Sequence, residues 1–240
     1  MIVSPAARPD SVQPDSPPDA RPADAADPGL RAVLGLLGSW ELVAFTRLAG
    51  DAAAAPQVAD RIELCRLGGV ASARLARLGA LAAERGLDLG DAVAPFLRAC
   101  ADVDARTPAG SWWERLLTSY VGFGVEDDVA RLLAAALDPA ARAVVLSVLD
   151  DDGHAALVER RVLAQTAGDR VLASRLALWG RRLVGESLGV VGRLVAGHPE
   201  LADLLERSLD PIGDLPLQQR LFARLTAGHT RRMDRLGLTA

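Results

Sequence analysis

The chain has 240 residues, half of them hydrophobic and 4% aromatic, and its formal net charge is −4. This length is enough for one domain with a sizeable core. The weak acidic charge argues against a strong nonspecific grip on nucleic acid, although it leaves room for a local basic patch. No run of about eighteen uninterrupted apolar residues occurs, so we expect no membrane span.

The two cysteines and the N-terminal residues indicate the cellular compartment in which the protein is expected. Cys65 and Cys100 lie far apart inside apolar segments, so we expect buried free thiols rather than a disulfide. The first residues lack the basic-then-apolar pattern of a signal peptide. Together these features predict a cytoplasmic protein.

The sequence divides into a polar tail and one helical region. Residues 1–28 are rich in Pro, Asp, Ala and Ser; little of such a segment can be buried, so we expect a disordered tail. We expect residues 29–240 to fold as one all-α domain, with a bundle over 29–166 and accessory helices over 168–236.

Apolar residues that recur at steps of three and four predict the helices in chain order. The long helices are expected over 29–50, 56–85, 111–137, 139–166 and 169–197, and two further helices after His198-Pro199 and Leu215-Pro216. Short loops join the first helix to the second and the third to the fourth, whereas residues 86–110 form a long crossover with its own short amphipathic piece. This order predicts a ferritin-like four-helix bundle with one long crossover and additional C-terminal helices.

The stretch Val144–Val162 is the most informative one. Read as one helix, it places Asp151 on an apolar stripe between Val148 and Val158, with His154 one turn further on. Burying such groups costs several kcal/mol unless they are paired, hydrogen-bonded or bound to metal. An acid followed three residues later by His, pointing into a helical bundle, is half of a di-metal carboxylate site.

The first two helices supply an incomplete second half. Glu41 is the one charge on the apolar face of its helix and fits a ligand position, with pairing to an Arg as the structural alternative. The second helix should supply acid-x-x-His, but Ala71 and Arg74 occupy those positions. Without metal, we predict that Arg74 donates hydrogen bonds of about 2.7–3.2 Å to Glu41, Asp151 or both.

The remaining helices add two observations. The third helix should supply an acid where Phe123 stands, and we expect Glu126 and Asp127, a turn away, to point elsewhere. On the fifth helix, Glu186 is a further acid on an apolar stripe and a candidate second acid for the site.

Four segments resemble a known family: residues 41–49, 111–122, 151–162 and, most specifically, RLALWGRRLVGES at 175–187. Over roughly residues 30 to 205 the chain is similar to actinobacterial ferritin-like proteins related to the tRNA hydroxylase that acts on methylthio-isopentenyl-adenosine. The resemblance implies the bundle fold and, in intact members, an oxygen-activating di-iron centre. It also implies that ligands are lost at Ala71, Arg74 and Phe123, which leaves Glu41, Asp151 and His154 as vestigial positions.

Other residues could carry function but also have plainer interpretations. Arg side chains on the fifth helix could contact phosphate or RNA, or could form a solvated face paired with acids; they are Arg175, Arg181, Arg182 and Arg193. Trp112 and Trp113 could line a pocket or anchor the third helix in the core. His198 and His229 have no neighbours that would indicate a catalytic triad.

The sequence therefore supports two hypotheses. In the first, the chain is a non-catalytic binding or interaction module, with no cofactor and a core charge cluster of Glu41, Arg74, Asp151 and His154. In the second, it is an iron-dependent hydroxylase or oxidase with an altered ligand set. A tRNA partner and a homo- or hetero-oligomer are open under both hypotheses.

Overall fold

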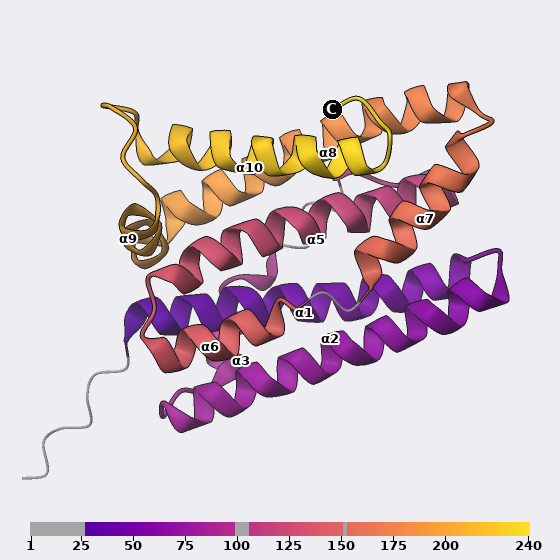
Figure 1. The fold of residues 1–240 in the computed structure, drawn as a ribbon. Helices are drawn as coiled ribbons and strands as arrows, with labels where there is room; N and C mark the ends of the chain where they lie inside the picture. The colour runs from indigo at the N-terminus through magenta and orange to yellow at the C-terminus, as the bar shows by residue number, and fades with distance from the viewer. Residues whose placement is uncertain (1–26, 99–105, 151–152) are drawn as a thin grey trace, which may run out of the picture.

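A computed structural model describes residues 27–98, 106–150 and 153–240, and these residues form helices and connections without a strand (Figure 1). The helices are α1 (Pro28–Ala54), α2 (Val58–Glu84), α3 (Leu89–Val93), α5 (Trp112–Ala135), α6 (Pro139–Val148), α7 (His154–Thr166), α8 (Arg170–Gly197), α9 (Pro199–Ser208) and α10 (Leu217–Arg235). The tail predicted over residues 1–28 lies outside the described residues up to position 26.

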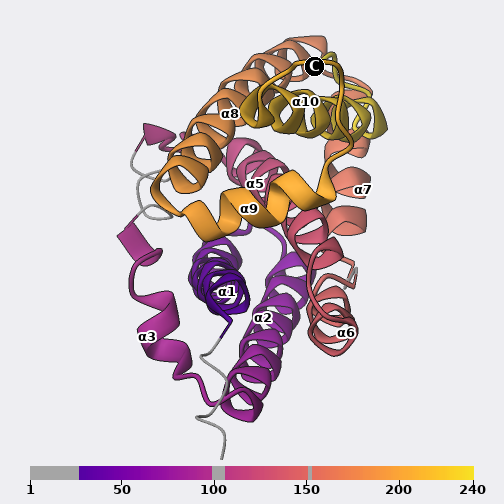
Figure 2. The same ribbon diagram turned by 90° about the vertical axis from the view of Figure 1, so that its left-hand side faces the viewer.

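The long helices form layers that agree with the predicted bundle. The hairpin of α1 and α2 forms one side, α5 lies against it, and α6 with α7 completes the four-helix arrangement (Figure 1). Seen from the end, α8 and α10 lie beyond α5, and α9 runs across the end of the bundle (Figure 2). The crossover between α2 and α5 contains α3, which ends at Val93, the first apolar residue of the short amphipathic piece predicted there.

Short-range capping fixes where several helices begin. The Asp27 side chain accepts hydrogen bonds from the backbone N–H groups of Gly29 and Leu30, at 2.9 and 3.3 Å. Ser111 and Asp169 accept in the same way at the starts of α5 and α8. These side chains satisfy N–H groups that have no partner within the helix, which is why the sequence located these helix starts well.

The fourth helix is interrupted, so the prediction of one helix over 139–166 is wrong. Helix α6 ends at Val148, and α7 begins at His154 after Gly153, whose φ is +96°. The sequence between them contains three Asp residues before this glycine. Asp is a poor residue for a helix interior and Gly readily adopts positive φ, so this segment favours a break. Asp151, the centre of the predicted stripe, lies outside the described residues.

The crossover is held against α1 by a close backbone approach. A Cβ atom at Gly35 would clash with the carbonyl oxygen of Ala92 in α3, and one at Gly38 would lie 2.6 Å from Val93. Glycine at both positions therefore lets α3 lie directly on α1. The main core next to this contact includes Leu34, which is fully buried.

Within the described residues, α1 is one helix long and apolar enough to cross a membrane by length and composition. In this structure 61% of its most apolar window is buried by the rest of the bundle. A core helix of a helical bundle passes the same test, so the finding is weak evidence for membrane insertion.

The expected burial of the thiols is wrong for Cys65. This residue is exposed on the outer side of α2, because the buried face of that helix runs through Leu64, Leu67 and Ala71 instead. Cys100 lies outside the described residues.

Candidate functional site

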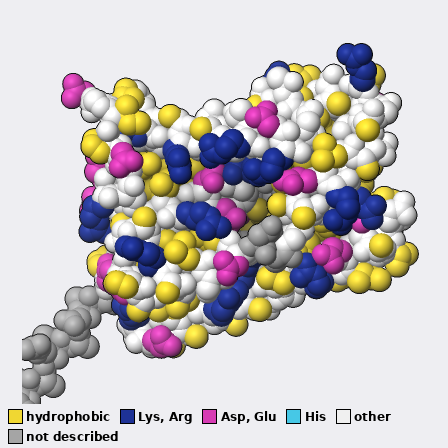
Figure 3. Space-filling view, viewed as in Figure 1, with side chains coloured by type: hydrophobic (Ala, Val, Ile, Leu, Met, Phe, Trp, Pro, Cys, Tyr) yellow, Lys and Arg dark blue, Asp and Glu magenta, His cyan; other side chains and the backbone are white. Residues whose placement is uncertain are grey.

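A cavity of about 280 Å³ lies at the centre of the bundle and is lined by α1, α2, α5, α7, α10 and the end of α6. Charged side chains of both signs face it: Glu41, Arg74, Glu126, Asp127, Asp128, Arg131, Asp150, Arg232 and Arg235. The face seen in Figure 3 shows basic and acidic side chains gathered side by side over its middle. Glu41, Arg74 and His154 of the predicted core charge cluster line this cavity, and Asp151 lies outside the described residues.

Arg74 and Glu41 face each other across this cavity. Arg74 Nη1 lies 4.0 Å from Glu41 Oε1, and Arg74 Nη2 donates to the backbone carbonyl of Asp150. The predicted contact to Glu41 is therefore an ion pair, longer than the predicted hydrogen bond. Ala71, one turn earlier on α2, is buried and lines the same cavity.

His154 is the first residue of α7 and is 8% exposed. Its Nε2 lies 3.2 Å from Ser119 Oγ, and its ring centroid is 4.9 Å from that of Phe123 at an interplanar angle of 56°. The imidazole is thus in contact with a hydroxyl and an aromatic ring, both from α5. Phe123 fills the position where the resemblance implies an acid.

Glu126 and Asp127 line the cavity, so the expectation that they point elsewhere is wrong. Burial raises the pKa of Glu126 to about 8. The positive charge of Arg47 opposes this rise, and the negative charge of Glu41 adds to it. Burial also raises the pKa of Asp127 to about 6, with Arg131 opposing the shift. Glu126 follows Phe123 by three positions and so shares its helix face, a signal in the sequence that pointed to it.

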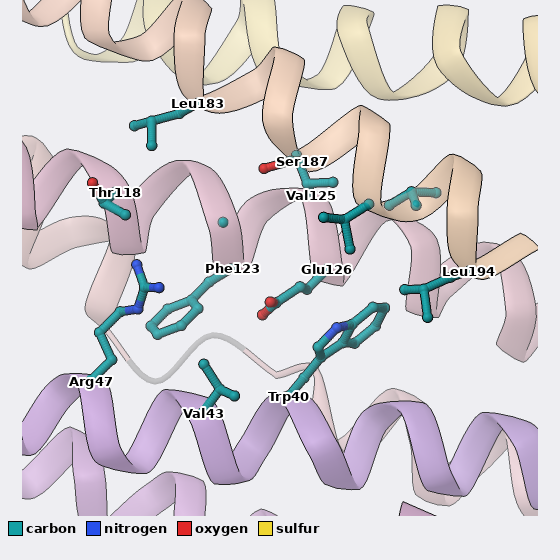
Figure 4. Close-up of a pocket in the computed structure, with 13 residues that line it drawn as sticks. Trp40, Val43, Arg47, Thr118, Phe123, Val125, Glu126, Leu183, Ser187 and Leu194 are labelled. Carbon is teal, nitrogen blue, oxygen red and sulfur yellow. The ribbon is translucent and has the colours of Figure 1, made fainter. Parts of the chain in front are cut away.

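A second, smaller cavity of about 50 Å³ lies between α1, α5 and α8. Trp40, Phe123 and Glu126 line both this cavity and the central one. Figure 4 shows the Glu126 carboxyl group between Phe123 and Trp40, with aliphatic side chains such as Leu194 around the remaining space. Glu126 therefore stands at the boundary between a charged cavity and an apolar one.

A buried ion pair adjoins the bundle centre at the far end of α1. Asp51 is 2% exposed; its Oδ1 accepts a hydrogen bond from Arg115 Nε at 2.8 Å and lies 2.8 Å from Arg115 Nη2 in the same ion pair. Burial raises the pKa of Asp51, and the charges of Arg115 and Arg47 oppose that shift. The pair borders a third, more open cavity of about 490 Å³. The sequence analysis did not single out Asp51, because a carboxylate near a helix end carries no distinctive pattern.

Glu186 does not line the central cavity. Its side chain is 34% exposed and lies 3.8 Å from Arg106, whereas its neighbour Ser187 lines the small apolar cavity. The candidate second acid is therefore an ion-pair partner at the surface. Glu126 on α5 is the second acid that the structure brings beside Glu41.

The arginines of α8 divide into two groups. Arg175 pairs with Glu114 at 3.1 Å, and Arg182 donates to the carbonyl of Arg106 at 2.8 Å. Arg181 and Arg193 are exposed. Contacts within the chain thus account for half of the arginines considered as RNA contacts.

The remaining aromatic candidates pack into the structure. The His198 ring stacks on Phe96 with centroids 4.4 Å apart. His229 is 2% exposed, and burial lowers its pKa to about 4. Trp112 and Trp113 pack at the edge of the hydrophobic core, as the interpretation as core anchors predicted.

The donor set at the bundle centre does not fit a di-iron centre. Such a centre takes one Glu from each of two helices and Glu-x-x-His from each of the other two. Among the described residues, no group of three or more His, Cys, Asp and Glu side chains lies close enough together to hold a metal ion. On α2, Ala71 offers no donor atom, and Arg74 offers a fixed positive charge.

A family model described as "Ferritin-like domain, actinomycetes" matches residues 26–208. A solved structure described as protein 19 with aldehyde deformylating oxidase activity from Synechococcus is similar with a TM-score of 0.65 and 20% sequence identity, covering 91% of this chain and 94% of that chain. At this identity the likeness shows the fold alone. No curated protein matches the chain.

Proposed function

The chain belongs to the family of ferritin-like domains from actinomycetes, and on this basis we propose that it is a metal-free, non-catalytic binding module. Its central cavity takes the position of the di-iron centre that the fold holds in other proteins. The cavity remains open to a ligand, while arginine side chains provide the positive charge that iron would otherwise supply.

The observation that carries this proposal is the position of Arg74. Its guanidinium group lies 4.0 Å from the Glu41 carboxylate in the cavity. Arginine stays protonated at any physiological pH, so Arg74 balances the charge of Glu41 permanently. A divalent cation at the same place would meet electrostatic repulsion from this guanidinium instead of two ligands from α2.

A second candidate function is an iron-dependent hydroxylase or oxidase of the tRNA-hydroxylase-like class with an altered ligand set. It is favoured by one observation: Glu41, Glu126 and His154 line the same cavity. In that case these two carboxylates and the imidazole would have to move closer together to hold a metal next to Arg74, because no such group is close enough among the described residues. The two candidates make opposite predictions about iron.

Iron analysis of protein expressed with added iron tests both candidates. We expect the wild-type chain to contain far less than one iron per chain and to lack a ligand-to-metal absorption band. Near-stoichiometric iron with such a band would overturn the proposal in favour of the second candidate.

Restoring the two missing iron ligands on α2 tests whether their absence is the reason that the chain binds no iron. We expect the double variant Ala71→Glu/Arg74→His to bind iron, because it supplies Glu-x-x-His beside Glu41 and Glu126. Arg77→His is the matched control, since Arg77 is exposed on the same helix and does not line the cavity. If the double variant binds no more iron than this control, even with Phe123→Glu added, the assignment of ligand positions is wrong.

A further inference from the structure

Arginine side chains from three different helices converge on the central cavity. Arg74 comes from α2, Arg131 from α5, and Arg232 and Arg235 from α10. These residues are far apart in the sequence, so the tertiary structure alone brings them together. Contacts within the chain use part of their donors: Arg131 Nη2 donates to the carbonyl of Leu149 at 2.9 Å, and Arg235 Nε donates to Glu159 at 2.8 Å. A guanidinium group has five N–H donors and no acceptor, so one such contact leaves further donors on each of these two side chains.

The carboxylates of the same cavity are largely matched or neutral. Glu41 pairs with Arg74, and Asp128 Oδ2 accepts a hydrogen bond from Arg232 Nη1 at 2.8 Å. Burial raises the pKa of Glu126 to about 8, so this group is mostly protonated at pH 7. Asp127, whose pKa is raised to about 6, is still mostly ionised at pH 7, so Asp127 and the exposed Asp150 both oppose an incoming anion.

Arg232 has donors that the described part of the chain does not use. The residue is 7% exposed, and its Nε and Nη2 atoms are buried and meet no acceptor among the described residues. Its side chain lies against α5 at Gly124, where a Cβ atom would come within 2.5 Å of Arg232 Cδ and Nε. Both atoms have almost no accessible surface, so a ligand in the cavity reaches them only if the Arg232 side chain shifts away from Gly124. Because buried donors in proteins are normally hydrogen-bonded, such a contact would supply the acceptor that they lack.

We infer that the central cavity binds a small oxyanion, with Arg131 and Arg232 as its principal anchors. The site of a metal cation in the fold would then have become a site for an anion. This inference rests on the proposed function, because iron and an anion ligand would compete for the same space.

The volume of the central cavity limits the size of the ligand. An engineered cavity of about 150 Å³ binds benzene, so a cavity of about 280 Å³ holds a molecule of roughly ten non-hydrogen atoms. Guanidinium groups bind carboxylate and phosphate in a bidentate manner. The ligand class is therefore a small metabolite with a carboxylate, phosphate or sulfate group.

Isothermal titration of the full chain with sulfate and with succinate, at pH 6.5 and constant ionic strength in chloride, tests the inference. We expect one or both anions to bind, whereas 1,4-diaminobutane, which has the chain length of succinate and the opposite charge, should not. Binding of sulfate alone would indicate a phosphate-like group, and binding of succinate alone would indicate a carboxylate. Equal binding of the diamine, or no binding of either anion at millimolar concentration, would overturn the inference.

Two variants assign the binding to the cavity. Arg131→Gln removes an exposed arginine that lines the cavity, and we expect about a tenfold loss of affinity from one lost charge-assisted contact. Arg224→Gln is the matched control, because Arg224 is exposed on α10 and does not line the cavity. Equal losses in both variants would show that the anion binds elsewhere.

The second anchor needs a paired change, because Arg232→Gln alone would leave Asp128 without its partner. The variant Asp128→Asn/Arg232→Gln removes both charges, and a melting curve verifies that it folds. A folded double variant with unchanged anion affinity would contradict the role of Arg232. The outcome is separable from the proposed function: iron in the wild-type chain overturns that proposal, whereas an iron-free chain that binds no anion overturns only this inference.

Discussion

The two cavities on either side of Glu126 differ in chemistry although they share part of their walls. The central one, between α1, α2, α5 and α10, is lined by acids and arginines. The small one, between α1, α5 and α8, is lined mostly by apolar side chains, with Arg47 and Glu126 as charged or ionisable members of its lining. Trp40 and Phe123 belong to both. One helix, α5, therefore presents a charged face to one cavity and an apolar face to the other.

This difference shows how the bundle tolerates charges in its interior. On the central side, carboxylates lie near guanidinium groups, as in the ion pairs of Arg74 with Glu41 and Arg232 with Asp128. At the boundary, burial raises the pKa of Glu126 to about 8, so this acid is mostly neutral at pH 7. Pairing and protonation are the two ways in which a buried carboxyl group avoids the cost of an isolated charge.

The largest expected effect lies on the apolar side. Leu183 lines the small cavity and is 2% exposed, so Leu183→Ala should lower the free energy of unfolding by about 3–5 kcal/mol by enlarging that cavity. Chemical denaturation measures the loss. The exposed Leu178, on the same helix, provides the control, and Leu178→Ala should change stability by less than about 0.5 kcal/mol. Equal effects would contradict the description of Leu183 as a buried side chain in the wall of an apolar cavity.

The next largest effect on stability concerns Glu126, at the boundary between the two cavities, and it depends on pH. The folded-state pKa of Glu126 is raised from 4.5 to about 8, so the folded chain holds a proton that the unfolded chain releases. The stability that comes from this proton is fully present below pH 4.5 and is lost as the pH rises to about 8. Glu126→Gln mimics the protonated form, so it should be more stable than wild type by on the order of 3 kcal/mol at pH 9 and nearly equal at pH 4.5.

Denaturation of both proteins at several pH values measures this difference. A wild-type chain and a Glu126→Gln variant whose stabilities run parallel from pH 4.5 to 9 would show that Glu126 is ionised and solvated at neutral pH. Glu84→Gln, at the exposed end of α2, is the control and should leave the pH profile unchanged.

A smaller effect is expected from the ion pair on the charged side. Arg74→Ala removes the group that lies 4.0 Å from Glu41. Complete loss of a buried partner costs about 3–5 kcal/mol, but Arg74 and Glu41 keep 17% and 11% of their side chains exposed, so we expect a loss of about 1–2 kcal/mol. Arg77→Ala, at the neighbouring exposed arginine, should cost less than about 0.5 kcal/mol. An unaffected melting curve for Arg74→Ala would show that the guanidinium group does not stabilise the cavity.

The smallest effect is expected from the N-terminal segment. Deleting residues 1–26 removes the segment with the composition of a disordered tail and retains Asp27, which caps α1. The Tm should stay the same within error. A drop of several degrees would mean that this segment packs on one of the two sides compared above.

The sequence by itself predicted the helices and their order. Apolar residues at steps of three and four identified α1, α2, α5 and α8, and the side chains of Asp27, Ser111 and Asp169 located three helix starts. These signals act within one or two helical turns, so they can be read locally. The long crossover between α2 and α5 then followed from the order of the helices.

Only the tertiary structure decided which charges meet. It brought Glu126 rather than Glu186 to Glu41, and it gathered Arg74, Arg131 and Arg232 around one cavity. The rotation of one helix against another depends on how side chains of several helices pack together. The spacing within α5 places Glu126 on the face of Phe123, but only the packing of the helices decides that this face lines the cavity.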